Sequence, residues 1–528
     1  MELTGLSFIG SHRGSRDGAG FQAFAPQTGE PIQPVFRSAT PQELERAARL
    51  ATEAFASYAQ TSGKSRAAFL RRIAAGFEFH REELAQRAHL ETALPIPRLT
   101  GEVTRTANQL RMFATVVEEG TWVQARIDPA LPDRQPLPRP DIRSMLRPLG
   151  PVAVFGASNF PLAFSVGGGD TASALAAGCP VIVKAHPAHP GTSELAATII
   201  TECVLAHDLH PGVFSMLFDS GVAIGTALVK HPLIRAVAFT GSLRAGRALM
   251  NLAAARPDPI PCFTEMSSGN PVFILPGALR KGPAALAQSL FGSFTLGAGQ
   301  FCTKPGIVFV ADSPESTSFL DELKELVDQA QPFTMLTEGI VREYHRATAS
   351  RSQKVPLAAE SQPDATAQER GVPYHAGSKL FTVCLDQLIG EPELADEIFG
   401  PDTLLVNCDS SRDYLRAARA LDGHLTATIL GDDEDLAANR ELIQILEQKA
   451  GRLIFNGFPT GVEVSHAMVH GGPYPSTSDP RFTSVGSLAI YRFVRPVCFQ
   501  NFPQAMLPPE LQDANPLGIS RLRDGKQE

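Results

Sequence analysis

One of the seven cysteines of this chain lies in a sequence context that suits a nucleophile. Cys302 belongs to the run GAGQFCTKPG, where three glycines and a proline allow a turn that brings the backbone close to a ligand. Backbone N–H groups at such a turn favour the thiolate, the form of cysteine that attacks a carbonyl carbon, and they can also hold an oxyanion. A second interpretation stays open, because a lone cysteine is most often a small buried apolar residue.

A glutamate at the end of a predicted β-strand is the second candidate. Glu265 lies in CFTEMSSGNP, at the carboxyl end of the strand, which is where α/β sheets place their ligands. A partly desolvated carboxylate at that place could accept a proton from water as a general base. It could also be a structural group that hydrogen bonds hold in place.

Two further motifs could hold a nucleotide. In FTGSLRAGRAL, Gly241 and Gly246 bracket a turn from a strand into a helix, whose N-terminus could bind a phosphate, although many such turns carry glycine for geometry alone. In VIVKAHPAHPGT, Lys184 follows a buried strand and could bind ribose hydroxyls or a phosphate, or could be a solvated strand end. The residues after Lys184 offer no carboxylate that would repel a 2′-phosphate, so this motif permits NADP.

The elements that must position these residues follow from the periodicity. Residues 40–119 repeat apolar side chains at helical spacing and predict two or three long helices. Residues 151–270 alternate short β-rich runs with helical runs, which predicts βαβ units and a parallel sheet with helices on both faces. A second α/β domain is expected to follow, ending in a strand over 487–499. The proline-rich residues 128–150 favour an extended arm, and the polar residues 349–373 a surface insertion.

Composition excludes several classes of function. The chain has 528 residues, which is enough for two or three domains. Its 55 acidic and 47 basic residues give a net charge of −8, which argues against nucleic acid as a partner. No apolar stretch is long enough to span a membrane and no signal peptide pattern is present, so we expect a cytoplasmic protein without a membrane partner. The cysteines lie too far apart to predict disulfides or a metal site.

Six motifs, in this order and spacing, resemble the aldehyde dehydrogenase superfamily: FGASNFPLAFS, VIVKAHP, FTGS, FTEMSSGNP, GQFCTKPG and EIFGP. The resemblance implies an α/β fold with a doubly wound Rossmann-type cofactor domain, an α/β catalytic domain and a small oligomerisation arm. The implied boundaries are 1–127 and 151–269 for the dinucleotide-binding domain with its N-terminal helices, 270–481 for the catalytic domain, and 128–150 with 482–500 for the arm. The resemblance also implies a homodimer or a homotetramer.

The resemblance implies a role for each matching residue. Cys302 would attack the aldehyde to give a thiohemiacetal, while the Asn159 side chain and the Cys302 N–H hold the oxyanion. Glu265 would activate the water that hydrolyses the resulting thioester. NADP or NAD would accept the hydride, with NADP favoured. The expected cofactor-binding residues are Phe155, Gly156, Ala157, Ser158, Lys184, His186, Pro187, Gly241, Ser242, Met266, Glu397 and Phe399.

The chain departs from the common family pattern in three places. Residues 266–270, MSSGN, replace the Leu-Gly-Gly-Lys run that usually follows the general base. Ala157 and Ser158 replace the Pro-Trp pair that many members carry before the oxyanion asparagine. Pro187 stands where many members carry a glutamate, and this last departure agrees with a loss of strict NAD selection.

The segments HPAHPGTSE and FNGFPTGVEVSHAMVHGGPYPSTSDPRFTSVGS are most similar to family members that oxidise α-ketoglutarate semialdehyde (2,5-dioxopentanoate). The alternative is NADP-dependent oxidation of long-chain fatty aldehydes, for which Phe160, Leu162, Phe164 and Phe294 could line an apolar tunnel. A substrate with a carboxylate needs a cationic anchor, and Arg111 is one candidate, although it could equally be a solvated helix arginine. A CoA-acylating enzyme and a non-catalytic protein on the same scaffold are disfavoured by the predicted base and nucleophile.

Overall fold

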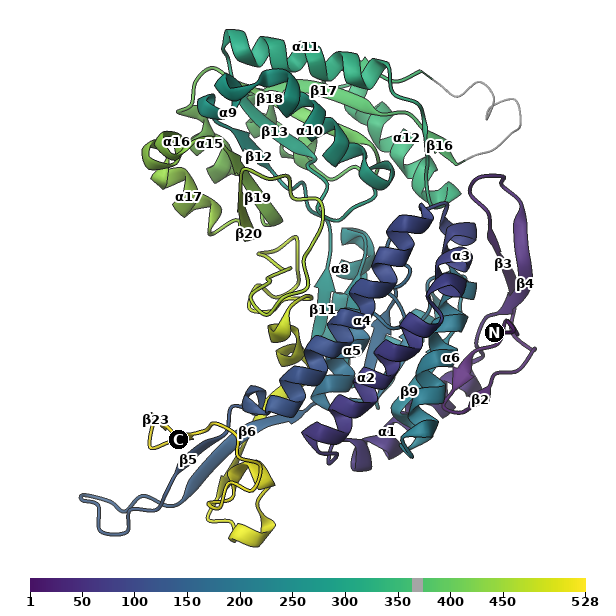
Figure 1. Ribbon diagram of the computed structural model, residues 1–528, viewed down its shortest axis with the longest axis vertical. Helices are drawn as coiled ribbons and strands as arrows, with labels where there is room; N and C mark the ends of the chain where they lie inside the picture. The colour runs from purple at the N-terminus through teal and green to yellow at the C-terminus, as the bar shows by residue number, and fades with distance from the viewer. Residues whose placement is uncertain (363–373) are drawn as a thin grey trace.

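The computed structural model describes residues 1–362 and 374–528, and it contains two seven-stranded sheets (Figure 1). The first sheet has the order β11-β10-β7-β8-β9-β1-β2, in which β11 to β9 are parallel and the β1–β2 hairpin is antiparallel. Parallel strands covered on both faces are apolar throughout, as in the VAVF run of β7. The strands are β1 Phe8–Ile9, β2 His12–Arg13, β7 Val152–Phe155, β8 Val181–Lys184, β9 Phe214–Leu217, β10 Ala236–Thr240 and β11 Cys262–Glu265.

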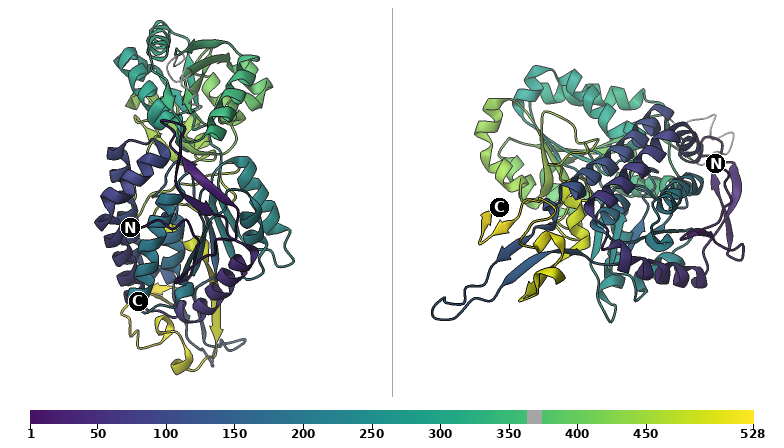
Figure 2. Two further views of the ribbon diagram at one scale, coloured as in Figure 1. Left: turned by 90° about the vertical axis from the view of Figure 1, so that its right-hand side faces the viewer. Right: turned by 60° about the horizontal axis from the view of Figure 1, so that its bottom comes forward.

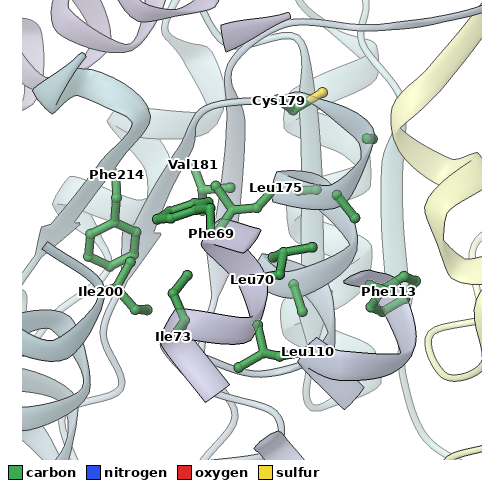
Figure 3. Close-up of a cluster of buried hydrophobic side chains, with 14 of the residues drawn as sticks. Phe69, Leu70, Ile73, Leu110, Phe113, Leu175, Cys179, Val181, Ile200 and Phe214 are labelled. Carbon is green, nitrogen blue, oxygen red and sulfur yellow. The ribbon is translucent and has the colours of Figure 1, made fainter. Parts of the chain in front are cut away.

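Helices cover both faces of this sheet. Alternate residues of β7 lie in two cores, one shared with α2, α4, α5 and α6 and the other with α1, α7 and α8. Figure 3 shows the first core, where Phe69 of α2, Leu110 of α4, Leu175 of α5 and Phe214 of β9 come together. Residues 40–119 are helical as predicted, but they form four helices instead of two or three, and the βαβ alternation is confirmed. The helices are α1 Pro41–Tyr58, α2 Gly63–Phe79, α3 Arg81–Thr92, α4 Ile96–Glu119, α5 Gly169–Ala177, α6 Pro190–Ala206, α7 Ala223–Lys230 and α8 Leu243–Ala254.

The second sheet is built from the chain after β11 and has the order β15-β17-β18-β13-β12-β19-β20, with only its edge strand β15 antiparallel. Its strands are β12 Val272–Ile274, β13 Ile307–Ala311, β15 Leu357–Glu360, β17 Lys379–Cys384, β18 Asp402–Cys408, β19 His424–Leu430 and β20 Ala450–Phe455. Its helices are α9 Pro276–Lys281, α10 Pro283–Thr295, α11 Pro314–Asp328, α12 Glu338–Ser352, α14 Leu385–Gly390, α15 Asp413–Ala420, α16 Asp433–Ala438 and α17 Arg440–Leu446.

A five-stranded sheet extends away from both of these, at the end that carries the C-terminus (Figure 1 and Figure 2). Its order is β21-β6-β5-β22-β23, with β5 Arg126–Asp128, β6 Ile142–Pro148, β21 Val494–Gln500, β22 Leu522–Arg523 and β23 Lys526–Gln527. The pairing of β6 with β21 joins the two segments predicted to form the arm. The predicted strand over 487–499 is wrong at its start, because Ser487–Phe493 form the 3-10 helix η5 and the strand begins at Val494. The domain boundaries stay a prediction.

Shorter elements complete the fold. The antiparallel pairs are β3 Gly20–Phe24 with β4 Pro31–Arg37 and β14 Phe333–Thr334 with β16 His375–Ala376. The predicted surface insertion over 349–373 is wrong in its first part, which completes α12 and forms β15, while residues 363–373 lie outside the described residues. Within the described ranges, no helix combines the length and the apolar character that crossing a bilayer requires.

Candidate active site

The carboxyl ends of four neighbouring strands of the first sheet meet along one edge. Register places Lys184 at the end of β8 beside Phe155 at the end of β7, and Glu265 at the end of β11 beside the last residue of β10. The loops that leave these strands therefore share one rim, as ligand sites of α/β sheets do. The predicted cofactor motifs and the predicted base lie at this rim.

Cys302 reaches the same place from the loop between the 3-10 helix η3, Leu296–Gly299, and β13. Gly297, Ala298 and Gly299 all have positive φ, at 59°, 59° and 66°. A Cβ at Gly299 would lie 2.0 Å from the Gly400 carbonyl oxygen, so only glycine lets this loop close against the EIFGP motif. The turn predicted from the glycines around Cys302 is confirmed.

The structure brings Cys302 and Glu265 together around a histidine that sequence reasoning missed. The Cys302 Sγ and His470 Nε2 form a hydrogen bond of 3.5 Å. The same Nε2 also lies 2.9 Å from Glu265 Oε1. Ser484 Oγ donates to the second oxygen, Glu265 Oε2, at 2.6 Å. His470 is almost fully buried, so its imidazole serves this cluster rather than solvent.

His470 comes from the segment that returns from β20 to the first sheet, where Thr477 bridges to Glu265. Its backbone N–H donates to Thr483 Oγ1 at 2.8 Å, and a Cβ at Gly471 would lie 2.5 Å from the Phe482 carbonyl oxygen. The only signal in the sequence is a histidine followed by two glycines in a loop-rich block. That signal places His470 in a turn but does not say which turn.

The protonation states of the cluster follow from burial and charge. Burial, together with the charges of Glu265 and Glu397, raises the pKa of the Cys302 thiol well above its ordinary value. Burial also tends to raise the pKa of Glu265, but the proximity of His470 and the hydrogen bond from Ser484 outweigh it, so the pKa of Glu265 is lowered. The resting cluster thus pairs a neutral thiol with an ionised carboxylate, and His470 Nε2 lies within hydrogen-bonding distance of the sulfur.

Donors for an oxyanion flank the sulfur. Asn159, in the loop after β7, donates from Nδ2 to the Gln300 carbonyl at 3.0 Å, which places its amide beside the Cys302 loop. The Cys302 backbone N–H has no acceptor among the described residues. Asn270, which the sequence analysis did not single out, donates from Nδ2 to the carbonyls of Cys302 and Lys304 at 2.8 and 2.9 Å. Asn270 therefore holds the backbone of the Cys302 loop in place.

A buried ion network ties the Cys302 loop to the loop after α14. Lys304 Nζ lies 2.5 Å from Asp402 Oδ1 and donates to the Ile398 carbonyl at 2.8 Å. Arg351 pairs with the other Asp402 oxygen at 2.8 Å. Because Ile398 follows Glu397, the network fixes Glu397 relative to Cys302.

Glu397 lines a pocket that also contains Leu243 of α8 and Ser267 from the loop after β11. Ser267 Oγ donates to Glu397 Oε2 at 2.8 Å, and burial raises the pKa of Glu397 to about 7. Phe399, two residues further along, is half-buried. The pocket therefore joins the N-terminus of α8 to the loop that follows Glu265 and to the loop that carries Glu397.

The remaining predicted cofactor residues lie along the same rim. Lys184 is half-buried and has neither an acidic partner within 4.0 Å nor a hydrogen-bond acceptor in the described chain. Burial lowers the pKa of Lys184 to about 8, with the charge of Asp219 opposing it. Ser242 caps α8 by accepting from the Ala245 N–H at 3.3 Å. The others follow strand ends or lie beside them: Gly156, Ala157, Ser158, His186, Pro187, Gly241 and Met266.

The predicted substrate residues divide into two groups. Phe160 and Phe164 lie together, with ring centroids 5.3 Å apart, and Phe164 is 6.1 Å from the His470 ring. Leu162 and Phe294 belong instead to two separate buried cores, so the four residues do not line one tunnel.

Arg111 does not reach the cluster. Its guanidinium forms a fork-shaped ion pair with Glu78 of α2, and its side chain is 41% exposed. Arg105, six residues earlier on α4, faces Phe164, and six residues turn a helix by about 240°. The structure thus supports the second interpretation of Arg111, as a solvated helix arginine, and corrects its assignment as a substrate anchor.

A sequence model of the aldehyde dehydrogenase family matches residues 13–491. Alpha-ketoglutaric semialdehyde dehydrogenase 2 of Azospirillum brasilense is 49% identical over 529 residues, covering 100% of both chains. Alpha-ketoglutaric semialdehyde dehydrogenase of Acinetobacter baylyi is 45% identical and covers 99% of both. Among solved structures, an NAD+ complex of an aldehyde dehydrogenase from Bacillus cereus has a TM-score of 0.79 at 22% identity, over 94% of this chain and 96% of that one, which shows a shared fold.

Proposed function

Because the chain belongs to the aldehyde dehydrogenase family, we propose that it oxidises α-ketoglutarate semialdehyde to α-ketoglutarate with NADP+ or NAD+. Two full-length relatives bearing the name of this activity support the choice of substrate. The observation that carries the chemistry is the convergence of Cys302 Sγ, His470 Nε2 and Glu265 within 4.8 Å of one another. Leu162 and Phe294 lie in separate cores, which disfavours the long-chain aldehyde alternative.

The first step is attack of Cys302 Sγ on the aldehyde carbon. The thiol proton passes to Nε2 of the neutral His470 imidazole, which lies 3.5 Å away, while a C–S bond forms and the carbonyl π electrons move onto oxygen. The Asn159 amide and the unpaired Cys302 N–H stabilise that oxyanion. The product of the step is a thiohemiacetal on Cys302.

NADP+ or NAD+, when bound, supplies the hydride acceptor that turns the thiohemiacetal into a thioester. Glu265 then takes a proton from water while the water oxygen attacks the thioester carbon, and the C–S bond breaks to release the acid. The lowered pKa of Glu265 keeps it ionised and ready for this role near neutral pH. Ser484 holds its Oε2 in place from the opposite side of the carboxylate.

The rim fits a nucleotide. The unpaired Lys184 ammonium suits ribose hydroxyls or a phosphate, and the N-terminus of α8 after Gly241 and Ser242 offers free N–H groups to a pyrophosphate. Phe155, Met266, Glu397 and Phe399 would enclose the rest of the cofactor. The residues directly after Lys184 offer no carboxylate that would repel a 2′-phosphate, which favours NADP+ while allowing NAD+.

The test is a substrate panel with each cofactor. We expect kcat/KM for 2,5-dioxopentanoate to exceed that for decanal, NADP+ to be the better cofactor, and Cys302→Ala to remove turnover with every aldehyde. A higher kcat/KM for decanal would overturn the proposed substrate. Substantial turnover by Cys302→Ala would overturn the nucleophile.

We also propose that the enzyme assembles as a homodimer or homotetramer through the five-stranded arm. Strand β21 is an edge strand of that sheet, and an edge strand offers unpaired backbone groups to a second copy. An apolar side chain of the arm, Leu137 between β5 and β6, is 70% exposed in the single chain. Sedimentation as a monomer at micromolar concentration would contradict this assembly.

A further inference from the structure

Arg105 of α4 carries a buried positive charge that the protein leaves half satisfied. Its Nε donates to the Val462 carbonyl at 3.3 Å. Its two terminal nitrogens, Nη1 and Nη2, are both buried and have no hydrogen-bond partner in the described chain. No carboxylate of the described residues lies within 4.0 Å of them. Buried donors without partners are rare in proteins and costly, so this pair calls for a ligand.

A short series of ring contacts connects Arg105 with the sulfur. The Arg105 guanidinium carbon lies 4.9 Å from the centroid of the Phe164 ring, which lies 6.1 Å from the His470 ring, and His470 contacts Cys302 Sγ. Burial lowers the pKa of Arg105, while the negative charges of Glu102, Cys302 and Glu265 raise it. The guanidinium thus lies close enough to Cys302 and Glu265 for their charges to affect the pKa of Arg105.

The nearest acid does not neutralise this arginine. Glu102 Oε1 accepts two backbone N–H bonds, from Leu162 and Ala163, each of 2.9 Å, and so holds the loop that carries Phe160 and Phe164. Burial raises the pKa of Glu102. Only Oε1 is used by the backbone; Oε2 is buried without a hydrogen-bond partner, and no ion pair within 4.0 Å joins Glu102 to Arg105 among the described residues, so the Arg105 charge remains available.

Two other arginines lie near the site, and neither offers the same fork. Arg98 lies over the rings of Phe160 and Phe301, with its guanidinium carbon 5.0 and 4.6 Å from their centroids, and one terminal nitrogen donates to the Asn159 carbonyl. Arg452 uses both terminal nitrogens on the carbonyls of Gly461 and Pro459. Among the described arginines, Arg105 is the one whose two terminal nitrogens are both buried and unpartnered.

We propose that Arg105 binds the carboxylate of the substrate through both terminal nitrogens while the aldehyde carbon lies at Cys302. The inference rests on the proposed function and deepens it, because it defines the substrate class as short aldehydes with a carboxylate at the opposite end. A planar guanidinium matches the two oxygens of a carboxylate, so the pair fixes orientation as well as charge. Phe164, between Arg105 and His470, forms the wall along which the carbon chain lies.

The test compares a charged and an uncharged aldehyde of equal length, 2,5-dioxopentanoate and pentanal. For Arg105→Met we expect kcat/KM for the semialdehyde to fall roughly 100-fold, mainly through KM, because one partner of a buried charge pair is lost. We expect kcat/KM for pentanal to change less than about threefold, since no interaction with pentanal is removed. Arg105→Lys keeps a charge but not the fork and should fall between the two.

The matched control is Arg111→Met, which removes an arginine from the same helix but breaks only the ion pair with Glu78. Arg111→Met should leave kcat/KM unchanged for both the semialdehyde and pentanal. Inhibition by α-ketoglutarate, the dicarboxylate product, gives a second readout. In Arg105→Met we expect the inhibition constant of α-ketoglutarate to rise together with the KM for the semialdehyde.

Two results would overturn the assignment of Arg105: equal losses for both aldehydes, or an unchanged KM for the semialdehyde. Activity with pentanal shows that the variant is folded. The proposed function fails separately, if the wild-type enzyme prefers pentanal to the semialdehyde.

Discussion

The substitution Glu265→Gln should have two opposite effects, since Glu265 acts both as a charge beside Cys302 and as a base toward water. The atoms of Cys302, His470 and Glu265 lie within 4.8 Å of one another. At that separation and an effective dielectric constant of about 20, two unit charges repel by about 3.5 kcal/mol. The amide removes this repulsion, which is one of the charge effects that raise the pKa of the Cys302 thiol. The pKa of Cys302 should therefore fall.

The first readout is the rate at which iodoacetamide alkylates Cys302 without substrate or cofactor. Because the thiolate is the reactive form, we expect alkylation near neutral pH to accelerate, by up to roughly 400-fold if the full repulsion is relieved. Peptide mass spectrometry separates Cys302 from the exposed Cys384 and Cys498. Glu78→Gln, an acid-to-amide change that faces Arg111 instead, should leave the rate unchanged.

The second readout is turnover. Without a base for water, the thioester accumulates, so Glu265→Gln should give a burst of reduced cofactor followed by a steady rate reduced by roughly 100-fold or more. Faster alkylation with slower turnover is the signature of the proposed arrangement. Slower alkylation would show that Glu265 deprotonates the sulfur itself, and a normal steady state would remove its role toward water.

Four further outcomes follow from the same geometry. Asn159→Ala removes one oxyanion donor and should lower kcat by roughly 100-fold, with KM little changed, in steady-state assays. His470→Asn removes the acceptor of the thiol proton, so kcat/KM should fall roughly 100-fold. It also removes a neighbour that lowers the pKa of Glu265, so the acidic limb of the pH–rate profile should move to higher pH. An unshifted limb would contradict the contact between His470 and Glu265. Lys184→Met should raise KM for NADP+ roughly tenfold or more while the kcat for saturating cofactor stays close to wild type, because it removes a single charge contact with the cofactor. Zn²⁺ should inhibit the enzyme and protect Cys302 from alkylation, reversibly on chelation, because a thiolate, an imidazole and a carboxylate can converge on one ion; Cys302 alkylated at the same rate with Zn²⁺ present would refute this.

Sequence patterns predicted the parts of the site that depend on local structure. Cys302 stands in a glycine-rich turn and Glu265 at a strand end, and both features are properties of a few consecutive residues. His470 was missed because its role depends on a segment that returns to β11 from the far end of the second sheet. No local pattern states where such a loop will dock.

The two arginines of α4 show a second limit. Periodicity predicted the helix that carries Arg105 and Arg111, but the choice between them requires knowing which face meets the loop after β7. The C-terminal strands β22 and β23 have two residues each, which is too short for an alternating pattern, so their addition to the arm could not be predicted.

The contacts of Lys304 have a mechanical consequence. The Lys304 ammonium, two residues after Cys302, donates a hydrogen bond to the Ile398 carbonyl and forms an ion pair with Asp402. Removing one partner of such a buried ion pair costs roughly 3 to 5 kcal/mol. The nucleophile and Glu397 therefore travel as one rigid block attached to the second sheet. A displacement of the second sheet relative to the first would therefore move Cys302 and Glu397 together, and would change the distance from the sulfur to Glu265, which stands on β11 of the first sheet.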